Sequence, residues 1–197
     1  SHRFPLAESR LLSFAETMKR TVFLGTYTNG ESKGIYSCRF DDATGMLSGF
    51  RLAAETPSPS FLALHPNGKF LYAVNETNDF SGEASGSVTA YRITDPSTGA
   101  LEKLNTVSSH GAHPCHLVLT PESDAVIIAN YTGSTVTTIE IREDGSLGQT
   151  LNRILHKGSS VLKPRQAEPH PHAVNLDPAN RFVFISDLGM DQIVRYE

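Results

Sequence analysis

PSFLALHPNGKFLYAVN (59–75), PCHLVLTPESDAVIIAN (114–130) and PHAVNLDPANRFVFISD (171–187) are three versions of one pattern. They align without gaps, at offsets of 55 and 57 residues. Each copy begins with proline, carries a second proline near its middle, and ends in Asn or Asp. A repeat of this length indicates copies of one small unit that bury a shared core by stacking on one another.

Each copy has the pattern of short strands joined by turns. Its second half is almost wholly apolar, as FLYAV, AVIIA or FVFIS. A third strand follows in every copy, as SVTAYRI (87–93), TVTTIEI (135–141) and QIVRYE (192–197), and a fourth follows in the first two. A strand that is apolar on both sides must be covered on both faces. Four-stranded sheets stacked around an axis supply that cover, so the sequence predicts an all-β fold of the β-propeller type.

The pattern divides the chain in two. Residues 18–197 are predicted to form a partial propeller of about three to four blades, preceded by a tail or short helix over 1–17. TVFLGTYT (21–28) and KGIYSCRF (33–40) resemble strands two and three of a further blade. Because the chain stops in the third strand of a blade, we expect it to be a fragment covering roughly the first half of a ring.

Composition excludes several classes of protein. A net charge of −4, a pI of about 6.0 and the lack of any Lys/Arg run argue against nucleic-acid binding. The apolar runs are too short to span a bilayer. Two cysteines, Cys38 and Cys115, do not make a disulfide framework. We therefore predict a reduced, cytoplasmic protein.

Antiparallel geometry places the loops before the repeat prolines on the same face as the loops after the second strands. These loops are long, and long loops on a rigid scaffold commonly carry function. His113 and His170 each precede a repeat proline, and His172 is equivalent to Cys115 in its copy. His116 should point the other way, so His110, His113 and His116 do not converge as zinc ligands would. No metal and no cofactor is predicted.

Four stretches together resemble the lactonase family of seven-bladed β-propellers. They are FLGTYTNGESKGIYSCRFD (23–41), PSFLALHPNGKFLYAVNE (59–76), HPCHLVLTPESDAVIIANYTGSTVTTIEI (113–141) and AEPHPHAVNLDPANRFVFISDLGMDQIVRY (167–196). The resemblance implies seven blades, with the N-terminal strands completing the last one. It also implies hydrolysis of a sugar-acid lactone, such as 6-phosphogluconolactone to 6-phosphogluconate in the pentose phosphate pathway. A histidine matching His172 lies in the site of such relatives.

Lactone hydrolysis needs a base for the attacking water, donors for the oxyanion and positive charge for any phosphate. We take His172 as the first candidate base, because imidazole titrates near neutral pH. His170 and Glu168 complete the catalytic candidates. The predicted substrate-binding residues are His113, Arg165, Lys163, Asn130 and Asn75. Lys163 and Arg165 would hold a phosphate.

Three alternatives stay open. A propeller can be a non-catalytic binding module, since one fold hosts many functions. A carboxymuconate-type cycloisomerase is similar in sequence. In a calcium-dependent lactonase, polar residues such as Asn75, Glu76, Asn130 and Asp187 would hold the metal, although a short polar residue ending each second strand is also typical of a turn.

Overall fold

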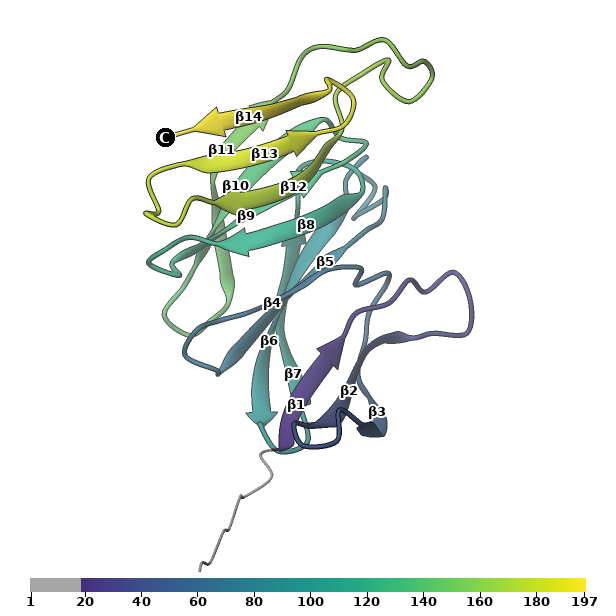
Figure 1. Cartoon of the computed structure of the whole chain (residues 1–197), viewed down its shortest axis with the longest axis vertical. Coiled ribbons are helices and arrows are strands. Elements are labelled where there is room, and N and C mark those ends of the chain that lie inside the picture. The colour runs from purple at the N-terminus through teal and green to yellow at the C-terminus, as the bar shows by residue number, and fades with distance from the viewer. Residues whose placement is uncertain (1–18) are drawn as a thin grey trace, which may run out of the picture.

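Residues 19–197 are described by the computed structural model, and they form fourteen strands in four antiparallel sheets. The sheets are stacked one after another along the molecule (Figure 1). In this part of the chain there is no helix with the length and apolar character needed to cross a membrane. The predicted tail over 1–17, together with Met18, lies outside the described residues.

Every repeat forms one sheet. The first sheet has the order β1-β2-β3: Lys19–Leu24, Gly34–Asp41 and Leu47–Glu55. The second has the order β4-β5-β6-β7: Leu62–Leu64, Phe70–Asn75, Ser87–Asp95 and Ala100–Ser108. The third has the order β8-β9-β10-β11: Pro114–Leu119, Ala125–Asn130, Thr135–Ile141 and Leu147–Leu155. The fourth has the order β12-β13-β14: Pro171–Leu176, Val183–Asp187 and Gln192–Tyr196. The predicted all-β blades are confirmed.

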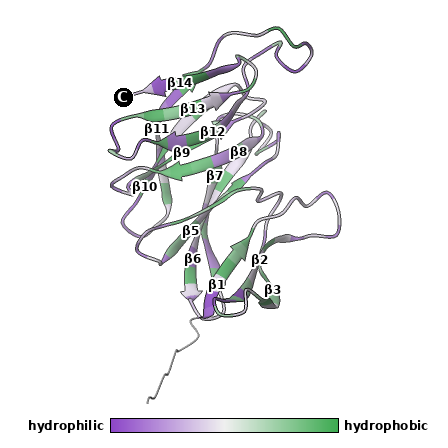
Figure 2. Ribbon diagram, in the orientation of Figure 1, coloured by the Kyte–Doolittle hydropathy of each residue, from purple (hydrophilic) through white to green (hydrophobic). Residues whose placement is uncertain are grey.

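The second strand of a blade is buried on both faces, as its apolar sequence predicts. In β5, Tyr72 and Val74 pack in one core cluster with residues of the third sheet. Leu71 and Ala73 point the opposite way and pack with Ile35 of the first sheet. Successive side chains of a strand alternate between its two faces. The strand thus packs against the sheets before and after its own. Figure 2 shows hydrophobic residues in green along strands within the stack.

The same alternation continues in β9. Val126 and Ile128 belong to the core cluster between the second and third sheets. Ile127 and Ala129 pack instead with residues of the fourth sheet, among them Ile185. Each apolar face is covered by the next copy, so equivalent strands lie side by side. β8 accordingly contacts both β4 and β12.

A repeated polar contact, here called the inter-sheet junction, closes each apolar interface at one end. It joins the last residue of a second strand to the residue that follows the outer strand of the preceding sheet. Asn75 Nδ2 donates to Thr56 Oγ1 at 2.8 Å, and Thr56 directly follows β3. Asn130 Nδ2 donates to the Ser109 carbonyl at 3.0 Å, and Ser109 directly follows β7.

The third junction is built from ionisable groups. His156, which follows β11, donates from Nδ1 to Asp187 Oδ2 at 2.6 Å, and both side chains are buried. The hydroxyl of Tyr196 lies 2.9 Å from His156 Nε2. Burial and the nearby Asp187 raise the pKa of Tyr196, so its phenol remains protonated and can donate to that nitrogen. The junction therefore recurs at all three sheet boundaries with different chemistry.

Replacing Asn130 with alanine should weaken the boundary between the second and third sheets. The variant removes a fully buried amide whose nitrogen also lies near the hydroxyls of Thr135 and Thr137, leaving the Ser109 carbonyl without that donor. We expect a loss of about 1–3 kcal/mol in the apparent free energy of unfolding, measured by urea titration.

The matched control is Asn152→Ala in β11, which deletes an exposed amide and should change stability by less than about 0.5 kcal/mol. Equal stability of the two variants would contradict a structural role for the junction.

Candidate active site

A pocket of about 170 Å³ lies where the four sheets meet at one end of their inner strands. Every sheet contributes to its lining. The lining residues are Tyr27, Ser60, Glu76, Cys115, Tyr131 and His172.

The lining residues fall into two sets of repeat equivalents. Ser60, Cys115 and His172 each occupy the second position of their copy. Glu76 and Tyr131 each follow the final residue of a second strand, and Tyr27 lies in the corresponding turn after β1. Residues from distant parts of the sequence meet here because the sheets stack in register around the pocket.

Glu76 is held by two hydroxyl groups. Its Oε2 accepts a hydrogen bond from the Tyr27 hydroxyl at 2.9 Å and another from Ser60 Oγ at 2.5 Å. Burial and the hydrogen bond to Glu76 raise the pKa of Tyr27, which keeps the phenol protonated as a donor. The carboxylate is therefore fixed in orientation on one wall of the pocket.

On another wall, two of the candidate histidines pack around Tyr131. His170 stacks on its ring with centroids 4.4 Å apart, and His172 meets it edge-on at 5.5 Å. His170 donates from Nδ1 to the Tyr131 carbonyl at 3.0 Å. His170 is buried, whereas His172 is exposed towards the pocket. Of these two histidines, only His172 is among the residues that line the pocket.

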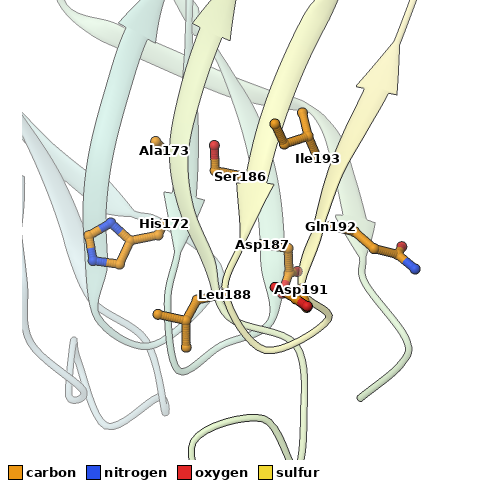
Figure 3. A pocket seen from close by; sticks show the side chains of 8 residues that line it. All are labelled: His172, Ala173, Ser186, Asp187, Leu188, Asp191, Gln192 and Ile193. Atoms are coloured by element: carbon orange, nitrogen blue, oxygen red, sulfur yellow. The ribbon is translucent and has the colours of Figure 1, made fainter. Parts of the chain in front are cut away.

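His172 also borders a second, larger hollow of about 490 Å³ on the open side of β12, β13 and β14. Figure 3 shows His172 at the end of β12, with Leu188 beside it and Asp187, Asp191 and Gln192 across the sheet. The carboxylate of Asp187 is already occupied, because its second oxygen accepts from the His170 amide at 2.8 Å. His172 is thus the residue shared by the two hollows.

The loop between β11 and β12 brings one predicted basic residue to the pocket. Arg165 donates from Nη2 to the Tyr131 hydroxyl at 3.3 Å. Gln166 fastens the same loop by donating to the Leu188 carbonyl at 3.0 Å. Lys163 and Glu168 are exposed and are not among the residues that line the pocket. Arg165 therefore contacts a residue of the pocket without lining the pocket itself, and Lys163 and Glu168 are not part of the lining either.

The other candidate histidines lie elsewhere. His113 Nδ1 is 2.9 Å from Thr132 Oγ1, and the residue does not line the pocket. His116 faces away from the pocket, as the strand alternation predicts, and packs on Phe61 with ring centroids 4.0 Å apart. Burial lowers the pKa of His116 and the nearby His172 adds to that effect, so His116 is a neutral residue between the strands.

Asn75 and Asn130, which the sequence analysis predicts to bind substrate, are not among the residues that line this pocket. Both amides are buried and serve the inter-sheet junctions described above. Asn75 Oδ1 also accepts from the Thr89 hydroxyl at 2.7 Å. Their side chains point between the sheets, on the same face of the strand as the preceding alternate apolar residues. We therefore assign them a structural role.

Sequence reasoning did not select Tyr27 and Tyr131 as pocket residues, and it considered Glu76 only as a ligand in a calcium-dependent lactonase. The signal was present in the alignment, since Glu76 and Tyr131 occupy one column directly after the polar residue that ends the second strand. The residue in that column lies just beyond the end of the strand, whereas the residue before it is buried. Among residues 19–197, no group of three or more His, Cys, Asp and Glu side chains is arranged to hold a metal ion.

Comparison with known proteins gives a consistent picture. Residues 21–197 match the family model described as lactonase, seven-bladed β-propeller. A 6-phosphogluconolactonase of Bacillus subtilis is 34% identical over 175 residues, which are 89% of this chain and 48% of that protein. The chain spans about half the length of the curated relatives that it matches.

Solved structures show the same likeness. A protein of Bacteroides fragilis superposes with a TM-score of 0.85 at 37% identity, over 94% of this chain and 49% of that one. A periplasmic gluconolactonase of Pseudomonas aeruginosa superposes with a TM-score of 0.82 at 34% identity, over 91% of this chain and 50% of that one. Because one of these proteins is periplasmic, the cytoplasmic location inferred from the cysteines stays a prediction.

Cys115 should be an unreactive thiol despite its place in the pocket. Burial, with a further effect of the Glu76 charge, raises its pKa to about 12. At pH 8 we expect alkylation by iodoacetamide to be about two to three orders of magnitude slower than that of a free thiol. Mass spectrometry after timed alkylation gives the rate at this residue.

The Cys115→Ser variant serves as the control and reports the labelling at Cys38 alone. A rate at Cys115 that reaches a plateau near pH 8 would show that the thiol ionises readily, against this expectation.

Proposed function

The chain belongs to the lactonase family of seven-bladed β-propellers, and from this premise we propose that the protein hydrolyses the 1,5-lactone of a sugar acid. One observation carries the proposal beyond family likeness. His172, the only ionisable nitrogen base that lines the pocket within residues 19–197, shares that lining with hydroxyl groups and a carboxylate from the three other sheets.

His172 acts as the general base. Its imidazole takes a proton from water as the water oxygen attacks the lactone carbonyl carbon, and the carbonyl oxygen becomes an oxyanion. When the tetrahedral intermediate collapses, the ring C–O bond breaks. The imidazolium returns its proton to the leaving alkoxide, giving the open-chain acid with a new hydroxyl group. No step in this scheme uses a metal ion.

Tyr131 stabilises the oxyanion in this scheme. Its hydroxyl oxygen already accepts from Arg165, so its own hydrogen is available for donation into the pocket. A neighbouring guanidinium charge strengthens such a donor. His170 supports this role, since it stacks on the Tyr131 ring and binds its carbonyl.

A phosphorylated lactone is the favoured substrate. Arg165 lies at the rim of the pocket, where its guanidinium could form paired hydrogen bonds with a phosphate at the far end of the substrate. Lys163, two residues away, would add charge without a fixed geometry. The relatives named above include lactonases of both a phosphorylated and an unphosphorylated gluconate lactone, so this part of the proposal concerns selectivity within one reaction.

His172→Ala in the purified full-length protein should lower kcat for 6-phosphogluconolactone by about two to four orders of magnitude, because the general base is lost. A coupled dehydrogenase assay for 6-phosphogluconate, corrected for spontaneous hydrolysis, measures the effect.

His65→Ala is the matched control, since His65 lies in the turn between β4 and β5 at the opposite end of the sheet and should keep activity within a few-fold. Retained kcat in a folded His172→Ala protein would exclude the proposed base. Loss of turnover in EDTA would instead favour a metal-dependent enzyme, and absence of turnover in the unmodified protein would favour a binding module.

Arg165→Ala should raise KM for 6-phosphogluconolactone by about 10- to 100-fold, because a charge-assisted contact with phosphate contributes roughly 1.5–3 kcal/mol. KM for unphosphorylated glucono-1,5-lactone should change by less than about threefold.

Arg165→Lys keeps the charge but loses the paired geometry, so its KM should fall between those of the other two proteins. Steady-state kinetics with both lactones provides the comparison. An equal rise in KM for both substrates would indicate that Arg165 acts through Tyr131 and does not bind phosphate.

A further inference from the structure

Glu76 places a fixed negative charge in the pocket, and the hydrolytic scheme above does not use it. We propose that Glu76 is a specificity residue that accepts hydrogen bonds from the hydroxyl groups of a neutral polyol ring and repels a dicarboxylate. This inference rests on the proposed function, since the ring is taken to be that of the sugar lactone. It concerns which substrates enter the pocket and not how the lactone bond is broken.

The contacts of Glu76 leave one of its oxygens available. Tyr27 and Ser60 both donate to Oε2 and so hold the carboxylate in one orientation. Within residues 19–197, Oε1 makes no hydrogen bond to the protein, and Glu76 takes part in no ion pair. A carboxylate held in this way offers an acceptor that needs no reorganisation when a hydroxyl donor arrives.

The charge of Glu76 acts across the pocket. It contributes, after burial, to the raised pKa of Cys115, which occupies the position equivalent to His172 in the neighbouring sheet. Among residues 19–197, no lysine or arginine lines this pocket, and Arg165 contacts it through the Tyr131 hydroxyl. Within the part of the chain that the structure describes, a ligand beside Glu76 therefore meets a negative charge without a lysine or arginine in the pocket lining.

These facts favour a particular ligand chemistry on this wall. A hydroxyl group donating to a carboxylate makes a charge-assisted hydrogen bond, roughly twice as strong as a neutral one. A second carboxylate at the same place would be repelled, because like charges at short range disfavour each other. Discrimination of this kind uses attraction for one ligand and repulsion of the other. Glu76 thus favours a neutral ring with hydroxyl groups over a ligand that carries two carboxylates.

The test compares Glu76→Gln with the unmodified full-length protein on two lactones of the same ring size. For glucono-1,5-lactone we expect kcat/KM to fall by about 10- to 100-fold, mainly through KM, because an acceptor for ring hydroxyls is weakened. For δ-valerolactone, which has no hydroxyl groups, kcat/KM should change by less than about threefold. An equal loss on both lactones would overturn the proposal, as would no loss on either.

A binding experiment separates this inference from the proposed reaction. 1,5-Anhydroglucitol carries ring hydroxyls but has no bond to hydrolyse, and its Kd is measured by NMR titration. Glu76→Gln should raise that Kd about tenfold and should lower the Kd of cis,cis-muconate. If the protein binds the polyol in this manner but hydrolyses no lactone, the proposed reaction fails while the role of Glu76 stands. Unchanged Kd values for both ligands would overturn the role of Glu76.

The matched control is Glu83→Gln, which removes the same charge from an exposed position in the loop between β5 and β6 and should alter neither Kd. Should Glu76→Gln fail to fold, Tyr27→Phe offers a second route, because Tyr27 is 55% exposed and its hydroxyl is one of the two that orient Glu76. That variant should raise the Kd of the polyol by a few-fold, and an unchanged Kd would count against the proposal.

Discussion

The architecture depends on burying the second strand of each blade on both of its faces. β5 and β9 send alternate side chains into the sheets before and after their own, so neither strand can be satisfied by its own blade. Stacking of equivalent copies is the arrangement that covers both faces at once. It also sets equivalent residues next to one another, and the pocket is assembled from them. The fold and the site therefore have one physical cause, which is the hydrophobic effect acting on a repeated strand.

The inter-sheet junctions show how a polar residue fits into this apolar stack. Asn75, Asn130 and Asp187 continue the buried face of their strands and reach the chain that leaves the preceding sheet. A buried polar group must find a partner, and the stack supplies one at the same place in each copy. At the boundary between the third and fourth sheets, the partner of Asp187 is His156. The second carboxylate oxygen of Asp187 also accepts a hydrogen bond from the His170 amide. The junction thus fixes the segment that carries His172.

The repeat alignment predicted the blades and the face that carries the site, because strand periodicity and proline-containing turns are local signals. It also predicted His172 in that face, and Arg165 near it. The substrate-binding role predicted for Asn75 and Asn130 took no account of alternation along the strand, which indicates burial because each lies two residues beyond a core residue. Glu76 and Tyr131 follow the strand in a turn, where side-chain direction depends on the packing of neighbouring sheets. The position of the loop carrying Arg165 depends likewise on contacts, such as that of Gln166 with Leu188, between segments far apart in sequence.

Ser60, Cys115 and His172 occupy equivalent positions in three copies of the repeat, but their side chains are a hydroxyl, a thiol and an imidazole. The backbone around each is maintained by its own blade, so one of these side chains can be exchanged without rebuilding the other two. In a stack of repeated units, the residues that line the pocket can therefore change one at a time. Because each lining residue can change separately, mutations after duplication of the repeat can alter substrate selectivity while the fold stays the same.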